Sequence, residues 1–329
     1  MTPVTGPIRW GIAGTGGIAA SFVSDFARLD TGNSEIGAVG SRSRASADAF
    51  AATHGIPRAH GTYEELAADP EIDIVYVAGI HPVHAEQAVM FLDAGKHVLV
   101  EKPLALDAGE VDTMIAAAER NDRFLMEAMW MRFNPAHVEM VRRIEAGAIG
   151  EVRRVIADFS FALPFDADHR LWDRRKGGGA LLDLGIYPLT LAWWLLGPPT
   201  SVDATGHVAD TGVDDEVAML CGWEGGATAL LTAGLRLDGT LAARIEGTKG
   251  TIELPLPAHC TDRMTLRYAG ESEEITAEPA GLHHQVVEVH RCLRAGERES
   301  PRMPWATSRA VIERFDAIRA TLGVRYGAD

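Results

Sequence analysis

A glycine-rich segment near the start of the chain has the spacing of a phosphate-binding turn. It reads Gly14-Thr15-Gly16-Gly17-Ile18-Ala19 and joins an apolar, strand-like segment, residues 8–13, to a segment of helical periodicity. In that setting the first glycine permits a tight turn, the second lets the backbone approach a pyrophosphate, and the helix N-terminus offers N–H groups to the phosphates. A plain glycine-rich turn is the alternative. We predict that a dinucleotide is bound by Gly14, Thr15, Gly16, Gly17 and Ile18.

The segment after the second expected strand, residues 35–40, bears on which dinucleotide binds. An NAD-selective site places Asp or Glu at this point to bind the ribose 2′-hydroxyl, whereas this chain reads Ser41-Arg42-Ser43-Arg44. A guanidinium with a neighbouring hydroxyl suits the charge of a 2′-phosphate. We predict NADP, bound in part by Ser41 and Arg42, with NAD less favoured. Two solvated arginines at a strand end are the alternative.

Two further groups of residues could do chemistry. Lys102, in Glu101-Lys102-Pro103, directly follows the fourth expected strand, and ligands of open parallel sheets bind beyond the carboxyl ends of the strands. Asp183 and Tyr187 follow three glycines and are four residues apart, which puts both on one face of a helix. Pro188 predicts a kink or a late start of that helix. A charged loop and a packed tyrosine beside a capping aspartate are the alternatives.

The elements that must position these residues alternate over the first 126 residues. Strand-like and helix-like segments follow one another with short connections, which predicts an α/β fold with a doubly wound parallel sheet of Rossmann type. The expected strands are residues 8–13, 35–40, 74–78, 97–100 and 124–126. The expected helices begin near residue 18, span 46–54, follow Thr62, span 82–94 and run from Asp107 to about Asn121.

The pattern changes after about residue 150. Residues 151–161 are strand-like, an apolar helix is expected over 180–196, and glycine-containing turns at 224–226, 248–250 and 269–270 separate further strands. These features predict an α+β domain with a large, mostly antiparallel sheet. We place a dinucleotide-binding domain over 1–128 and a substrate-binding and oligomerisation domain over 129–329. The amphipathic C-terminal helix, 304–326, is the element that could pack back on the first domain.

Charge and cysteine usage narrow the choice of partners and compartment. A net charge of −15 and a pI near 5.2 disfavour nucleic acid and anionic membranes as partners. The scattered residues Cys221, Cys260 and Cys292 suit a reducing compartment, and we see no signal peptide and no membrane-spanning run. We therefore expect a cytoplasmic protein. His81 and His84 lack a recognisable third ligand, so we predict no metal site.

Several ordered motifs resemble the Gfo/Idh/MocA oxidoreductase family. The resemblance covers essentially the whole chain and is strongest to the branch that holds dimeric dihydrodiol dehydrogenase and NADP-dependent D-xylose 1-dehydrogenase. Four ordered motifs with compatible spacing are far more specific than one glycine-rich turn. They are residues 14–19, 81–86, 94–103 and 177–188, and residues 127–133 and 247–250 are also similar to that branch.

The resemblance implies roles for individual residues. It implies that Lys102 is the catalytic lysine, before a Pro103 that can be cis, and that Tyr187 is its partner. It also implies a cofactor-binding role for Gly79, His81 and Glu101, and a homodimer or homotetramer built through the C-terminal sheet. The chain departs from the family at Gly79-Ile80, where Thr-Pro is usual, so no side-chain contact is carried over there. Candidate substrate contacts, with interdomain packing as the alternative, are Trp130, Arg132 and Trp172.

The implied chemistry is hydride transfer, in which the protein orients and polarises the substrate. A tyrosine hydroxyl is a poor acid or base near neutral pH, and a neighbouring lysine cation improves it. We assign proton transfer to Tyr187, electrostatic stabilisation to Lys102 and an orienting role to Asp183; the first two roles could be exchanged.

The predicted function is NADP-dependent oxidation or reduction of a small polyhydroxylated or cyclic alcohol or carbonyl compound. An NAD-linked inositol or sugar dehydrogenase is one alternative, disfavoured by Ser41-Arg42 and by Tyr187, where many such enzymes carry His. A non-catalytic NADP-sensing regulator is another, disfavoured by the retained Lys102, Asp183 and Tyr187, which a sensor does not need.

Overall fold

The computed structural model describes residues 1–29 and 33–326. The chain forms two compact units, one of residues 1–130 with 281–309 and the other of residues 131–280 with 310–329. The division thus falls within the C-terminal helix α9, Trp305–Leu322. The proposed domain boundary after residue 128 stays a prediction.

The first unit contains a sheet of six parallel strands in the order β3-β2-β1-β4-β5-β6. Its strands are β1 (Ile8–Ala13), β2 (Ser34–Gly40), β3 (Arg58–His60), β4 (Ile74–Val77), β5 (His97–Glu101) and β6 (Leu125–Ala128). Its helices are α1 (Gly17–Phe26), α2 (Arg44–His54), α3 (Tyr63–Ala68), the 3-10 turn η1 (His81–Val83), α4 (His84–Asp93), α5 (Ala108–Arg120) and α8 (His283–Ala295). The predicted doubly wound parallel sheet is confirmed.

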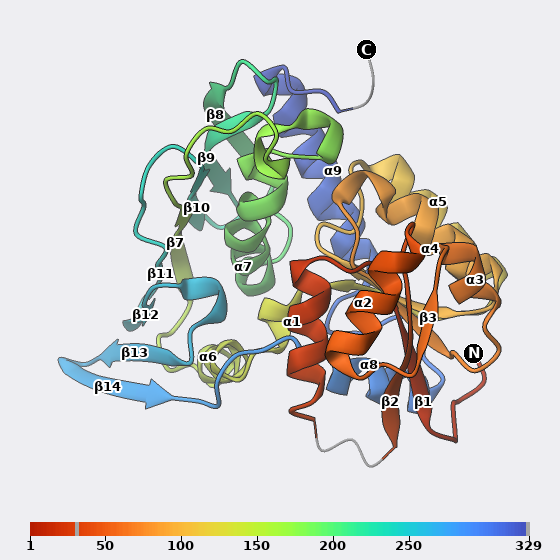
Figure 1. Cartoon of the computed structure of the whole chain (residues 1–329). Helices are drawn as coiled ribbons and strands as arrows, with labels where there is room; N and C mark the ends of the chain where they lie inside the picture. Colours follow the sequence, from red (N-terminus) through yellow and green to blue (C-terminus); the bar gives the residue numbers. More distant parts are fainter. Residues whose placement is uncertain (30–32, 327–329) are drawn as a thin grey trace. The chain divides into compact units, whose positions relative to one another are not determined.

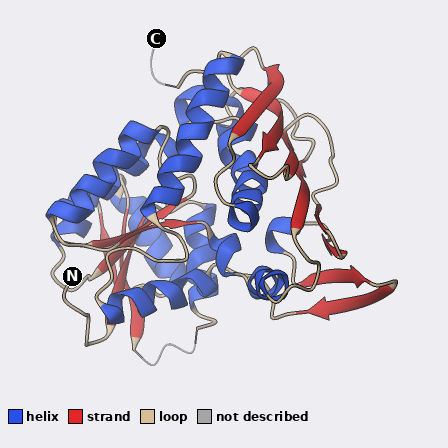
Figure 2. Ribbon diagram, turned by 180° about the vertical axis from the view of Figure 1, so that it is seen from behind, coloured by secondary structure: helices blue, strands red, loops and turns tan. Residues whose placement is uncertain are grey.

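The strand order explains where this sheet can bind a ligand. The chain moves from β1 to β2 in one direction and from β4 through β5 to β6 in the other, so right-handed crossovers place their helices on opposite faces (Figures 1 and 2). The order reverses between β1 and β4, and the crevice outside the carboxyl ends of these strands is the general ligand position of such sheets. The glycine-rich turn, Ser41, Gly79 and Lys102 all follow carboxyl ends of strands.

Helix starts in the first unit follow the local signals in the sequence. The Thr62 hydroxyl accepts a hydrogen bond from the Glu65 N–H at 3.1 Å, and the Asp107 carboxylate accepts one from the Glu110 N–H at 2.9 Å. Helix α2 ends at Gly55 in the left-handed region, with φ of 67°. Strand β3 was not predicted, because three residues are too few to show a period.

The second unit is built on an eight-stranded sheet in the order β14-β13-β12-β11-β7-β10-β9-β8. Its strands are β7 (Val152–Ser160), β8 (Ser201–Val208), β9 (Asp214–Gly222), β10 (Thr228–Gly234), β11 (Ala243–Gly247), β12 (Gly250–Leu254), β13 (Arg263–Tyr268) and β14 (Glu271–Thr276). Only the pairing of β7 with β10 is parallel among the described pairs. The three predicted turns connect β9 to β10, β11 to β12 and β13 to β14 as hairpins.

Helices cover part of this sheet. They are α6 (Pro135–Glu145), α7 (Ile186–Leu196), the π-helical turn η5 (Leu181–Gly185) and the 3-10 turns η2 (Trp130–Phe133), η3 (Arg170–Trp172), η4 (Arg174–Lys176) and η6 (Ala258–Cys260). Helix α7 packs on β7 and β10, and η5 packs on β9 and β10. The stretch Arg174–Leu196 is long and apolar enough to cross a membrane, but 83% of its most apolar window is buried inside the structure, as in the core helix of a globular protein.

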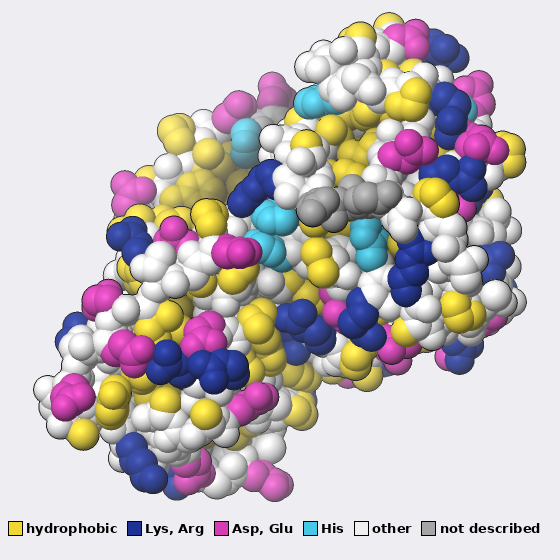
Figure 3. Space-filling view, turned by 90° about the horizontal axis from the view of Figure 1, so that it is seen from below, with side chains coloured by type: hydrophobic (Ala, Val, Ile, Leu, Met, Phe, Trp, Pro, Cys, Tyr) yellow, Lys and Arg dark blue, Asp and Glu magenta, His cyan; other side chains and the backbone are white. Residues whose placement is uncertain are grey.

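The surface carries both signs of charge. On the face shown in Figure 3, the described Lys and Arg side chains lie among Asp and Glu side chains and do not merge into one basic area. Charged side chains of both signs therefore lie close together on that face.

Candidate functional site

The glycine-rich turn has the geometry that phosphate binding requires. Gly14 has φ of 124°, and a Cβ there would lie 3.0 Å from the Ala78 carbonyl oxygen, so only glycine fits without strain. A Cβ on Gly16 or Gly17 would meet no atom within 4 Å, and no side chain in the described residues caps the N-terminus of α1. The first N–H groups of a ten-residue helix therefore face open space, which fits the pyrophosphate of a dinucleotide.

The end of β2 carries hydroxyl and guanidinium groups. Ser41 is buried, and its hydroxyl oxygen accepts a hydrogen bond from the Ser43 N–H at 3.5 Å. Arg42 is exposed, whereas Arg44 forms an ion pair with Asp48 at 2.9 Å within α2. Of the two arginines considered from the sequence, Arg42 is therefore the one whose guanidinium is not placed against a helix carboxylate.

The turn after β5 holds Lys102 in a fixed backbone. Glu101 is buried and accepts hydrogen bonds from the Tyr76 hydroxyl and, at 3.2 Å, from the Lys102 N–H. The Lys102–Pro103 peptide bond is cis, as the family resemblance implied. Lys102 itself is half-buried at the carboxyl end of the strand.

His84 connects the turn after β5 with the turn after β4. The ring is fully buried, with Nδ1 2.9 Å from the Pro103 carbonyl oxygen and Nε2 3.2 Å from the Gly79 carbonyl oxygen. Burial lowers the pKa of His84 to about 4, so the ring is neutral at physiological pH. Both nitrogens face carbonyl oxygens, and no group of three or more potential ligands gathers within residues 1–29 and 33–326.

The departure from the family at Gly79 has a steric reason. A Cβ at this position would lie 2.7 Å from Cγ2 of Val83 and 3.4 Å from the Gln87 amide oxygen. His81, the other residue expected in this loop, is buried and sits edge-on to His84, with 5.7 Å between the ring centroids. Val83 thus occupies the space that a side chain at residue 79 would need, and only the backbone of Gly79 can contact a ligand.

In the second unit, Asp183 and Tyr187 lie on successive elements. Tyr187 is in the first turn of α7, just before Pro188, and α7 continues the helical turn η5 without a break, so the late helix start that Pro188 suggested is not found. Asp183 lies in the preceding turn η5, whose hydrogen bonds run from i to i+5. The one-face argument from i, i+4 spacing holds for an α-helix and therefore does not apply here. The Asp183 carboxylate accepts hydrogen bonds from Arg170 at 3.1 and 3.2 Å.

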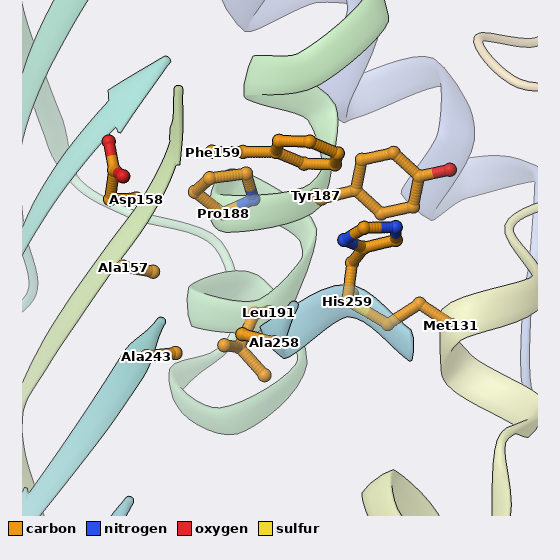
Figure 4. A pocket seen from close by; sticks show the side chains of 10 residues that line it. All are labelled: Met131, Ala157, Asp158, Phe159, Tyr187, Pro188, Leu191, Ala243, Ala258 and His259. Carbon is orange, nitrogen blue, oxygen red and sulfur yellow. The ribbon is translucent and has the colours of Figure 1, made fainter. Parts of the chain in front are cut away.

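Tyr187 stands among aromatic rings (Figure 4). Its ring centroid lies 5.2 Å from that of Phe159 and 4.9 Å from that of His259, and the latter two rings stack at 4.3 Å. They border an open hollow, whose empty space together with the solvent at its mouth amounts to about 270 Å³. The lining is mostly apolar: Met131, Ala157, Asp158, Phe159, Tyr187, Pro188, Leu191, Ala243, Ala258 and His259. The arrangement places apolar and aromatic surface beside the Tyr187 side chain.

The expected substrate contacts have structural partners within the second unit. The Arg132 guanidinium lies 4.8 Å from the Trp194 ring centroid in a cation–π contact. The Trp172 indole N–H donates to the Pro164 carbonyl at 3.1 Å, and its ring is edge-on to Phe165. Trp130, the last residue of the first unit, is half-buried. Their roles toward a substrate stay predictions.

Sequence reasoning missed three residues of the second unit: Phe159, Arg170 and His259. Phe159 is one residue of a strand whose alternation marks many candidates equally. Arg170 and His259 lie in short 3-10 turns, 13 residues before Asp183 and 72 residues after Tyr187. No local pattern relates such positions to Asp183 or Tyr187.

A doubly wound parallel sheet with a glycine-rich turn after its first strand is typical of dinucleotide-binding proteins. Residues 8–129 match the oxidoreductase family with an NAD-binding Rossmann fold, and residues 137–253 match the GFO/IDH/MocA C-terminal domain. The chain belongs to the Gfo/Idh/MocA oxidoreductase family, and it is an NAD(P)-dependent enzyme acting on alcohol groups, as predicted.

Relatives support the predicted branch of the family. Trans-1,2-dihydrobenzene-1,2-diol dehydrogenases from Danio rerio and Homo sapiens are 39% and 34% identical, over 98% of this chain and 99% of each relative. Among solved structures, aldose-aldose oxidoreductase from Caulobacter crescentus, complexed with glycerol, has a TM-score of 0.87 at 26% identity, over 96% of this chain and 98% of that one. A 3-ketoreductase from Actinomadura kijaniata, in complex with NADP and TDP-benzene, has a TM-score of 0.83 at 27% identity, over 95% and 97%.

Proposed function

We propose that this protein transfers a hydride between NADP(H) and a small cyclic alcohol or carbonyl compound of the dihydrodiol type. The observation that carries the substrate class is the apolar hollow beside Tyr187, walled by Phe159 and His259. Such walls favour the face of a ring over an open-chain polyol, whose hydroxyls would lose their hydrogen bonds to water there. The names of the relatives, which include dihydrobenzene-diol dehydrogenases, support the same class.

The preference for NADP rests on the end of β2. The strand ends at Gly40 without a carboxylate, and the exposed Arg42 follows the buried Ser41. We assign Gly14, Thr15, Gly16, Gly17 and Ile18 to the pyrophosphate, and Ser41 with Arg42 to the 2′-phosphate. We assign the other half of the cofactor to Gly79, through its backbone, and to His81, Glu101 and Lys102.

The residues of this chain perform the proton and charge steps. When bound, the cofactor supplies or accepts the hydride. In the reduction direction the Tyr187 hydroxyl would give its proton to the substrate oxygen and become a phenolate, and in the oxidation direction that phenolate would take the proton from the substrate hydroxyl. The Lys102 ammonium stabilises the negative charge that develops on the substrate oxygen. Asp183, whose carboxylate accepts a hydrogen bond from Arg170, orients Lys102 or a substrate hydroxyl. We keep Trp130, Arg132 and Trp172 as candidate substrate contacts.

A panel of substrates tests this proposal. NADP⁺ and NAD⁺ reduction would be followed with cyclic trans-diols, inositols and aldoses, and NADPH oxidation with the corresponding ketones and aldehydes. We expect the highest kcat/KM with cyclic diols and at least about tenfold tighter binding of NADPH than NADH by fluorescence titration. Equal affinities would contradict the cofactor assignment. Tight NADPH binding without any turnover would favour the sensor alternative.

We also propose a homodimer or homotetramer formed through the outer face of the large sheet. Register places Leu230 of β10 opposite Leu220 of β9 on one side and Ile156 of β7 on the other. Their side chains are 47%, 52% and 39% exposed, so three adjacent strands present an apolar row. Leu220→Glu with Leu230→Glu should convert the assembly to a monomer in light scattering. An oligomer mass equal to that of the wild type would contradict the proposed interface.

The cytoplasm is the compartment we propose. Cys221, Cys260 and Cys292 are all free thiols in the structure, which suits a reducing environment. Fluorescent tagging and fractionation would test this directly.

A further inference from the structure

A buried carboxylate lies directly behind the turn that precedes Tyr187. Asp214, the first residue of β9, is fully buried, and its Oδ2 accepts a hydrogen bond from the Leu181 N–H at 2.5 Å. Leu181 is the first residue of η5, so this bond satisfies an N–H group at the start of the turn. π-helical turns are rare and need support from outside their own backbone.

The neighbouring backbone leaves no room for a side chain between it and this carboxylate. A Cβ on Gly179 would lie only 2.4 Å from Oδ1 of Asp214, and Gly179 has φ of 113°, a conformation that glycine alone adopts readily. The Tyr326 hydroxyl donates to the Gly178 carbonyl oxygen at 2.5 Å and fixes the same glycine run from the C-terminal segment. Oδ1 of Asp214 is buried without a hydrogen-bond partner among the described residues.

Three ionisable groups interact with this carboxylate, and two of them, Arg319 and Asp215, are charged. Arg319 of α9 favours its ionised form, and the neighbouring Asp215 disfavours it. The Tyr326 hydroxyl is neutral, because burial first and the Asp214 charge second raise its pKa. Burial raises the pKa of Asp214 to about 7, against the opposing effect of the Leu181 N–H. Both protonation states are therefore populated near neutral pH.

The two states differ in how strongly they hold the turn. A hydrogen bond from an N–H to a carboxylate is about twice as strong as one to a neutral acceptor. The ionised carboxylate therefore accepts a stronger hydrogen bond from the Leu181 N–H than the protonated carboxyl does. Residues 181–185 lead without a break into the first turn of α7, which carries Tyr187.

We propose that Asp214 is a positioning residue for Tyr187: its carboxylate fixes the turn η5, and protonation of that carboxylate loosens the turn and lowers turnover. This inference rests on the proposed role of Tyr187 in proton transfer. Asp214 itself touches neither substrate nor cofactor in this scheme.

The structural half of the proposal is tested on the unaltered protein, without substrate. Hydrogen–deuterium exchange of peptides covering residues 178–190 would be measured from pH 5.5 to 8.5 and divided by the intrinsic rate at each pH. We expect about tenfold faster corrected exchange at the acid end, the ratio between a charged and a neutral hydrogen bond. Corrected exchange that does not vary with pH would overturn the proposal, whether or not any variant folds.

The functional half is tested with Asp214→Asn, which keeps an acceptor but cannot ionise. At every pH its kcat should equal the value that the wild type shows at low pH. The decrease of kcat toward acid pH, the acid limb of the pH profile, should therefore be absent, and KM for NADPH should be unchanged. Asp215→Asn is the matched control, because Asp215 is a buried neighbour on β9 whose carboxylate is paired with His207 at 2.7 Å. It should keep the acid limb, with the midpoint moved slightly to lower pH by the loss of one negative neighbour.

An acid limb that persists in Asp214→Asn would leave Asp214 with a purely structural role. Absence of turnover with every alcohol and carbonyl compound would instead defeat the proposed function, while the exchange measurement would still decide whether Asp214 holds η5.

Discussion

The glycine-rich turn of the first unit and the Tyr187 region of the second are built in different ways. The first is made of main chain: a left-handed glycine, a helix N-terminus without a side-chain cap, and the carboxyl ends of parallel strands. The second is made of side chains that arrive from a strand, a π-helical turn, an α-helix and a 3-10 turn. A main-chain site tolerates most changes of residue type, whereas a side-chain site depends on each contributor.

The two units also differ in their buried ionisable groups. Burial lowers the pKa of His84, His97 and His290 in the first unit to about 4. The second unit has His137 with the same shift, but also Asp214, whose pKa burial raises. We therefore expect acid pH to change the folding stability of the two units differently, and we treat effects on turnover separately.

The largest expected effect is acid destabilisation of the first unit. An unfolded histidine binds a proton below about pH 6.5, whereas these buried rings do so only near pH 4, so stability is present above that window and is lost as pH falls through it. Each ring contributes on the order of 1 kcal/mol of loss between pH 7 and 5.5.

In the second unit the raised pKa of Asp214 acts in the opposite direction, because its stabilising contribution is present at low pH and lost as pH rises through about 7. Outside residues 178–190, where local loosening at low pH is expected, exchange measured at pH 5.5 should therefore be faster in peptides of β4 and β5 than in peptides of β9 and β10. Equal exchange rates in the two units at this pH would contradict the predicted difference in their acid stability.

The next effect is on turnover. Tyr187→Phe and Lys102→Ala should each lower kcat by at least about 10², because each removes a group that we assign to the substrate oxygen. NADPH binding should survive in both. Tyr268→Phe, on the exposed strand β13, is the matched control and should keep full activity. Turnover within fivefold of wild type in both site variants would defeat the assignment.

A smaller effect is expected on the choice of cofactor. Arg42→Ala should reduce the preference for NADPH over NADH by about 10- to 100-fold, the loss of a charge-assisted bidentate contact. Arg44→Ala serves as control, because Arg44 is paired with Asp48. Fluorescence titration would give the dissociation constants of NADPH and NADH for each variant. An equal loss of NADPH preference in the two variants would show that neither arginine binds the 2′-phosphate specifically.

The smallest effect tests the main-chain site itself. Gly14→Ala should weaken NADPH binding by about tenfold, because a Cβ at this positive φ is strained and crowds the Ala78 carbonyl. Gly6→Ala, where a Cβ would meet no atom within 4 Å, should change nothing. Binding by Gly14→Ala equal to that of wild type would mean that the turn does not need its glycine geometry.

The same difference in construction decides how much could be predicted from sequence. The turn at Gly14, the caps at Thr62 and Asp107 and the three hairpins are local, so periodicity and turn residues were sufficient for them. The π-helical turn was not predicted, because its hydrogen-bond register depends on Asp214, 33 residues after Leu181. The periodicity of α8 also does not show against which part of the protein this helix packs. In the structure it packs on α1.

The fit between Gly179 and Asp214 has a consequence for anyone who alters this protein. The carboxylate occupies the volume that a methyl group at residue 179 would need. A library that randomises either position alone should therefore return mostly the parental residue. Varying both positions together should still return glycine at residue 179, because its φ of 113° strains any residue that carries a Cβ even when the carboxylate is removed. Residue 179 is thus constrained twice, by its own backbone conformation and by a carboxylate 35 residues further along the chain.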